Sequence, residues 1–208
     1  MAKMSKTFTA EGYEVTITPL LDLLNDRVDA KGVVGVLAHF RPSAETRAAL
    51  NGPDDGFKLL HEHAKRDDWM RLPVRHKGRK SEILTSHFVQ NYGAPYKYVV
   101  SVASKSFENA PDVILRALLR MTWAGRQVME GANTLGPTVA TLSLGSPSTM
   151  SFRPKLKGKD KKGNTSVLDL RLLHGDIVVM HGTDIHRCYE VGPKSTVYIF
   201  SSSGLTAV

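Results

Sequence analysis

The C-terminal part of the chain is a series of short strand-like segments, and this series restricts the possible folds more than any other feature. From Gly136 onward the strand-like segments are residues 138–144, 148–153, 166–173, 176–180 and 196–202. Glycine or proline stands in the gaps between them, where the chain has to turn. Such a series is typical of a barrel or a sandwich of short strands. We therefore expect a β-rich core in the second half of the chain.

The first part of the chain carries helix signals. Prolines at positions 19 and 42 open two short helical patterns. A longer helix is expected with Asn109 as its N-cap, and its buried face should hold Ile114, Leu115, Leu118 and Leu119. Further candidates are a helix at 56–68 and strands at 33–40, 83–89 and 96–102. Because the 208 residues contain no internal repeat or linker, we predict one α+β domain over residues 1–208.

Composition excludes several classes of protein. Cys188 is the single cysteine, which rules out an intrachain disulfide and a zinc site made of several thiolates; we expect it to be a buried, inert thiol. No apolar run reaches the roughly 18 residues of a membrane span, so no membrane partner is expected. The first residues lack the apolar region of a signal peptide. We therefore expect a cytoplasmic protein.

The basic charge of the chain is concentrated in two segments. The formal net charge is +8, and residues 65–80 and 153–162 hold most of the excess. The second segment is rich in lysine and lies between two strand-like segments, which is typical of a solvated hairpin loop. The first also contains Trp69 and His76, a composition that suits contacts with bases and phosphates. A nucleic-acid partner is therefore one alternative for this chain.

Two segments resemble a known family. Residues 135–152 (LGPTVATLSLGSPSTMSF) and 168–190 (LDLRLLHGDIVVMHGTDIHRCYE) are similar to the AlkB-like branch of the iron- and 2-oxoglutarate-dependent dioxygenases, particularly to fungal AlkB-like proteins. Weaker similarity extends the resemblance over about residues 80–203. The resemblance implies a double-stranded β-helix, or jelly roll, with helices from the N-terminal half packed on one side. This architecture agrees with the series of strands.

The residues that carry the family's oxidative chemistry are replaced in this chain. Active members hold iron with an H-x-D pair and a distal histidine, and two arginines on the last strand hold the cosubstrate and complete the site. The corresponding positions here read Val128-Met129-Glu130, Val191 after Tyr189-Glu190, and VYIFSSS at 197–203. The family's N-x-Y element is absent as well. We therefore expect no metal and no cofactor, and an apolar pocket lined by Val128, Val191 and Val197.

These replacements lead to a hypothesis of non-oxidative catalysis. We expect an isomerase, cyclase or lyase that acts without a cofactor on a small apolar or aromatic metabolite, and the fungal resemblance suggests secondary metabolism. The expected general base is a buried Glu130, with His186 or His181 as a further acid or base. Tyr189 and Tyr198 are the expected hydrogen-bond donors to a carbonyl or phenolate oxygen.

Two alternatives stay open at this point. The first is a catalytically inactive nucleic-acid-binding module that uses the basic segments. The second is an oxygenase whose iron site is rebuilt from Glu130 together with His181, Asp184 and His186. His174, in the LLHGD segment, is expected to cap a turn or to pack rather than to catalyse. The sequence specifies neither the substrate nor an oligomeric state.

Overall fold

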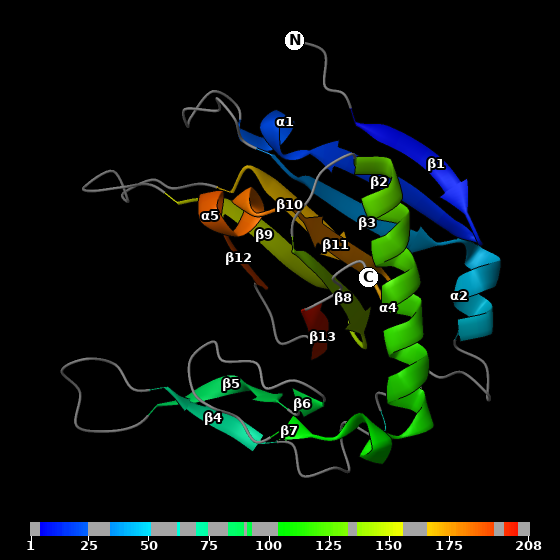
Figure 1. Ribbon diagram of the computed structural model, residues 1–208, viewed down its shortest axis with the longest axis vertical. Coiled ribbons are helices and arrows are strands. Elements are labelled where there is room, and N and C mark those ends of the chain that lie inside the picture. The colour runs from blue at the N-terminus through cyan, green and yellow to red at the C-terminus, as the bar shows by residue number, and fades with distance from the viewer. Residues whose placement is uncertain are drawn as a thin grey trace.

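The computed structural model describes residues 5–24, 34–50, 62, 70–74, 83–89, 91–92, 104–132, 137–155, 166–193 and 198–203. In this part of the chain the fold is mixed α+β, and its strands are mostly antiparallel (Figure 1). No helix among the described residues is long and apolar enough to cross a membrane.

The largest sheet has six antiparallel strands, drawn from both ends of the chain. Their order is β1 (Lys6–Ala10), β2 (Tyr13–Pro19), β3 (Val36–Pro42), β11 (Ile177–His181), β8 (Thr138–Leu144) and β13 (Tyr198–Ser203). The N-terminal strand β3 pairs directly with β11, which comes about 140 positions later in the sequence. The N-terminal segment is therefore part of the same sheet as the C-terminal strands.

A second sheet has three antiparallel strands in the order β10 (Leu168–Leu172), β9 (Ser148–Pro154) and β12 (Tyr189–Pro193). The short helix α5 (Asp184–Cys188) joins β11 of the first sheet to β12 of the second. Two smaller pairs, β4 (Met70–Val74) with β5 (Ile83–Val89) and β6 (Asn91–Tyr92) with β7 (Ser104–Lys105), lie at the end of the molecule opposite β1 (Figure 1). The remaining helical elements are α1 (Leu20–Leu24), α2 (Ala44–Leu50), the 3-10 turn η1 (Phe107–Asn109) and α4 (Asp112–Ala132).

Two apolar clusters cover the two faces of the six-stranded sheet. The first cluster lies between the sheet and α4, and it includes Ala38 and Phe40 of β3. The second lies between the two sheets, where Leu37 of β3 meets Phe152 of β9. Since side chains alternate along a strand, neighbouring residues of β3 belong to different clusters. The molecule thus has three layers: α4, the six-stranded sheet and the three-stranded sheet.

Most of the C-terminal strands form where the sequence predicts them. β8 has the predicted bounds, and β9, β10, β11 and β13 differ from prediction by one or two residues at an end. β5 and α2 are confirmed as well. In the N-terminal part, the predicted strand at 33–40 is observed as β3, whereas β1 and β2 are strands that the sequence did not predict and that extend the sheet beyond β3. The candidate strand at 96–102 lies outside the described residues, as does the candidate helix at 56–68 apart from Glu62.

The predicted helix after residue 109 is longer than expected, and its buried face differs. Asn109 belongs to η1 and α4 begins at Asp112, so the predicted N-cap is wrong. Leu119 is 69% exposed, whereas Ala117 and Met121 are buried. The buried stripe follows helical spacing over all 21 residues, and its members are Val113, Ile114, Ala117, Met121, Ala124 and Val128. Leu119 is two positions from both Ala117 and Met121, about 200° around the helix axis, and therefore faces solvent.

Candidate functional site

The region expected to replace the iron ligands lies on a helix. Val128 and Glu130 are in the last two turns of α4. Val128 is buried in the cluster between α4 and the six-stranded sheet, whereas Val191 packs against the cluster between the two sheets, so the two valines do not line one pocket as predicted. Glu130 is exposed, and the expectation of a buried general base is therefore wrong. The reason is helical geometry, since residues two apart on a helix point in nearly opposite directions.

In the HGTDIH segment, the polar side chains that the structure describes make hydrogen bonds or ion pairs with other residues of the protein. His181 is buried, and its Nδ1 lies 2.8 Å from Thr138 Oγ1. Asp184 Oδ2 accepts a hydrogen bond from the Val34 N–H at 2.8 Å, and its Oδ1 lies 2.9 Å from Arg187 Nε. The side chain of His186 lies outside the described residues. Among the residues that the structure describes, no group of three or more histidine, cysteine, aspartate or glutamate side chains could hold a metal ion.

Tyr189 and Val191 belong to the layer between the two sheets. Tyr189 is buried, its ring makes an edge-on contact with Phe152 at a centroid distance of 6.4 Å, and Val191 packs against the same cluster. Burial raises the pKa of Tyr189, and the neighbouring Cys188 thiol adds to the increase. Its hydroxyl is therefore a neutral donor at any physiological pH. Val197 and the side chain of Tyr198 lie outside the described residues.

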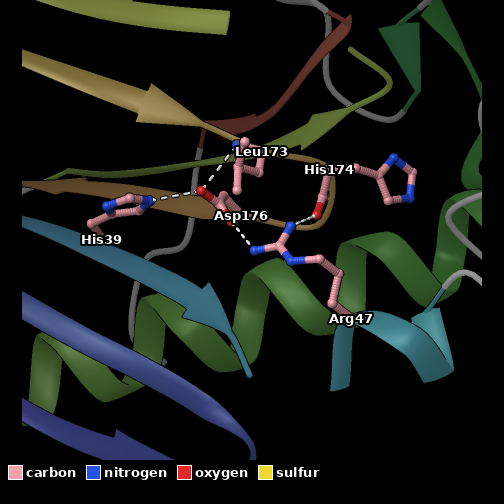
Figure 2. A network of polar contacts seen from close by, with 5 residues as sticks. All are labelled: His39, Arg47, Leu173, His174 and Asp176. Carbon is pink, nitrogen blue, oxygen red and sulfur yellow. Dashed lines mark hydrogen bonds and ion pairs between the residues drawn. The ribbon is translucent and has the colours of Figure 1, made fainter. Parts of the chain in front are cut away.

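A network of polar contacts lies at one end of the six-stranded sheet, next to the β10–β11 turn (Figure 2). Asp176, which is fully buried, immediately precedes β11. Its Oδ2 lies 3.1 Å from His39 Nε2 and accepts the Leu173 N–H at 3.0 Å, and its Oδ1 lies 3.0 Å from Arg47 Nη2. Arg47 also donates from Nη1 to the His174 carbonyl. The carboxylate thus connects β3, α2 and the turn before β11.

The ionised state of Asp176 determines which ring nitrogen of His39 carries the proton. Burial by itself would raise the pKa of Asp176, but the hydrogen bonds from His39, Leu173 and Arg47 outweigh it, and the net pKa is lowered. An ionised carboxylate only accepts hydrogen bonds, so the proton in the contact must belong to His39 Nε2. In a neutral imidazole the lone pair is then on Nδ1. Within the described part of the chain, Asp176 is the one hydrogen-bonding partner of the His39 ring.

His39 shares a face of the sheet with an unpaired hydroxyl. His39 has the same orientation on β3 as Leu37, which packs between the sheets. On β8, Ser143 has the same orientation as Val139, which packs against that same cluster. Ser143 is 3% exposed, its backbone N–H donates to the Asp176 carbonyl at 2.9 Å, and its Oγ has no hydrogen-bond partner in the described part of the chain. A histidine held by a carboxylate and a buried hydroxyl therefore flank Asp176 on the inner face of the large sheet.

Two structural predictions about single residues are confirmed. His174 caps the β8–β9 turn, because its Nδ1 accepts the Gly145 N–H at 2.9 Å, and Figure 2 shows its ring pointing away from Asp176. Cys188 is buried. The basic segment 153–162 begins at the end of β9 and leads toward β10, its antiparallel neighbour, as a hairpin connection should. Residues 156–165 of this connection, like most of the basic segment 65–80, lie outside the described residues.

Sequence reasoning missed His39, Arg47 and Ser143. His39 is 137 positions from Asp176 in the sequence. The residues next to His39 and Arg47 in the sequence form no motif that suggests a functional site. The available signal was an aspartate at the start of a strand that is otherwise apolar, because a buried carboxylate requires donors from elsewhere in the fold.

Comparison with known proteins adds no family to this description. No protein-family model matches the chain, and none of the curated proteins matches it.

Proposed function

We propose that this chain is an acid–base enzyme that acts on a small, largely apolar molecule without oxidising it. The observation that carries the proposal is the His39–Asp176 pair, in which a buried carboxylate orients an imidazole on the inner face of a sheet. A base held by a second polar group is the arrangement that proton-transfer enzymes use. His39 takes the part that the sequence suggested for Glu130, whose side chain is exposed.

The proposal includes a jelly-roll core. From β8 to β13 the chain passes from one sheet to the other at every connection except β9–β10, with β8, β11 and β13 in one sheet and β9, β10 and β12 in the other. The pairing is nested, since β9 pairs with β10 and β8 pairs with β11, all antiparallel. Jelly rolls are built from two packed antiparallel sheets with such connections. The alternation therefore supports the resemblance to the AlkB-like fold.

The proposed reaction is the movement of a proton next to a carbonyl group. His39 Nδ1 accepts a proton from the carbon beside the carbonyl, and the electron pair of the broken C–H bond moves toward the carbonyl oxygen. The Ser143 hydroxyl donates a hydrogen bond to that oxygen. Return of the proton to a different atom yields an isomer with unchanged mass. The two residues lie on β3 and β8 with β11 between them, and Ser143 is two residues beyond Thr141, which is level with His39. Their Cα atoms are therefore about 12 Å apart, a span that a small carbonyl compound can fill.

The test is untargeted turnover in heavy water. Purified protein is incubated in D₂O with a fractionated extract of uncharged small molecules, and mass spectrometry follows compounds that are depleted or gain deuterium. The wild type should convert at least one compound to an isomer that carries deuterium from the solvent. His39→Gln keeps an N–H donor for Asp176 but has no basic nitrogen, so we expect a rate loss of about 10²-fold or more.

A matched control separates loss of the base from general damage. Asp169→Asn alters an exposed carboxylate on β10 and should retain the wild-type rate. Wild-type turnover by His39→Gln would exclude His39 as the base. Absence of any converted compound with the wild type would contradict the enzymatic proposal as a whole.

A further inference from the structure

Tyr189 presents a buried hydroxyl that the fold itself does not use. The residue is 2% exposed, and its hydroxyl has no hydrogen-bond partner among the residues that the structure describes. Leaving such a group dry and unpaired costs free energy, and buried hydroxyls in folded proteins nearly always have a partner. A phenylalanine would provide the same ring without this cost. The hydroxyl at this position therefore points to a partner that binds from outside the chain.

The surroundings of Tyr189 are apolar. Tyr189 belongs to the cluster between the two sheets, with Phe152, Met180, Ile185 and Cys188 among its members. By contrast, the other large buried tyrosine, Tyr13, lies in the cluster under α4 and has the Arg120 guanidinium carbon 5.8 Å from its ring centroid. Burial and the neighbouring Cys188 account for the raised pKa of Tyr189, so no cation among the described residues acts on its hydroxyl. A charged ligand at Tyr189 would thus lose its hydration without gaining a counter-ion.

The site is distinct from the His39 network. Tyr189 follows α5 and pairs with Pro154 at the far end of β9, whereas Asp176 lies next to the β10–β11 turn, where Leu172 pairs with Ser148 at the near end of β9. The two positions on β9 are six residues apart, about 20 Å along an extended strand. A ligand at Tyr189 therefore does not depend on the acid–base proposal.

We propose that Tyr189 is the hydrogen-bond donor of a binding site between the two sheets for an uncharged aromatic ligand with a carbonyl oxygen. The phenol donates its O–H to the carbonyl oxygen, and the aromatic body of the ligand packs against the apolar side chains of the cluster. Because the raised pKa keeps the phenol protonated, the donor is present over the whole physiological range.

Three matched probes test this proposal by calorimetry or NMR titration. Acetophenone carries the carbonyl acceptor, α-methylstyrene has the same shape with a CH₂ group in place of the oxygen, and benzoate carries a charge. Acetophenone should bind the wild type about tenfold more tightly than α-methylstyrene, because it adds one hydrogen bond to a buried donor. Benzoate should bind at least tenfold more weakly than acetophenone.

Variants assign the effect to one hydroxyl. Tyr189→Phe should abolish the preference for acetophenone over α-methylstyrene, while Tyr13→Phe, the matched control, should retain it. His39→Gln should also retain it, so failure of the acid–base proposal and failure of this one are distinguishable. Circular dichroism checks that each variant is folded. Absence of acetophenone binding to the wild type, or an equal preference in Tyr189→Phe, would overturn the proposal.

Discussion

Asp176→Asn tests whether one buried carboxylate connects the two halves of the chain. The aspartate is fully buried and has donors from His39, Arg47 and the Leu173 N–H. Asparagine has almost the same shape, but it is uncharged and carries its own N–H₂ group. That group would face one of the three donors, so at least one contact would become a donor–donor repulsion.

The expected loss of stability is large. Removing one partner from a buried ion pair typically costs 3–5 kcal/mol, and we expect about 3 kcal/mol here. The lower end applies because the side chains of Arg47 and His39 are 23% and 11% exposed and regain some contact with water. For a chain of this length, about 3 kcal/mol corresponds to a drop in Tm of about 6–12 °C.

The loss should also depend on pH in one direction. The folded-state pKa of Asp176 is below its ordinary value of 3.8, so its ionised form contributes stability above that value. This contribution disappears as the pH falls through the folded-state pKa, because the carboxyl group is then protonated in both states. The difference between wild type and variant should therefore be full at pH 7 and shrink as the pH falls below 3.8.

Urea unfolding at pH 7 and at pH 3, followed by circular dichroism, measures both effects. The control is Asp169→Asn on β10, an exposed carboxylate 2.6 Å from Ser151 Oγ, for which a loss of at most about 1 kcal/mol is expected. A loss below about 1 kcal/mol for Asp176→Asn, or a loss of equal size at both pH values, would refute the reasoning.

Three further predictions concern the packing around the candidate sites. Gly182→Ala should lower the free energy of unfolding by at least about 2 kcal/mol in urea unfolding, because Gly182 has φ +99° and a Cβ there would lie 2.7 Å from Gly35 Cα. An unchanged free energy of unfolding would show that the backbone after β11 and the backbone before β3 can move apart without cost. Leu119→Glu should change stability by less than about 0.5 kcal/mol, whereas Met121→Ala should cost about 2–4 kcal/mol, and the reverse order would assign α4 the wrong buried face. Tyr189→Phe should resist alkaline unfolding better than the wild type: the raised pKa means that unfolding is favoured as the pH rises above the ordinary value of 10.0, when only the unfolded tyrosine ionises. Thermal melts from pH 8 to 11 measure this, and parallel curves for the two proteins would contradict it.

The sequence could predict a residue of the candidate site only where the local sequence pattern fixes the direction of its side chain. Tyr189 and Val191 have the same orientation on β12 and pack between the sheets, although the sequence predicted no strand there. Glu130 could not be placed in this way. Its burial depended on whether residues 128–130 continue a helix, and α4 does continue through them. The sequence did not predict a role for His39, because its hydrogen-bonding partner Asp176 is more than a hundred positions away.

The amino-acid sequence by itself determined most strands of the C-terminal half, with β12 as the exception, together with their turns and the buried thiol. These features follow from local rules: apolar alternation, glycine and proline at turns, and the composition of each segment. Tertiary structure alone decided that β3 pairs with β11, that Leu119 faces solvent, and that His39, Arg47 and Asp176 meet. The physical reason is that strand partners and buried charge pairs are selected by long-range packing, which brings together residues with no recognisable pattern between them.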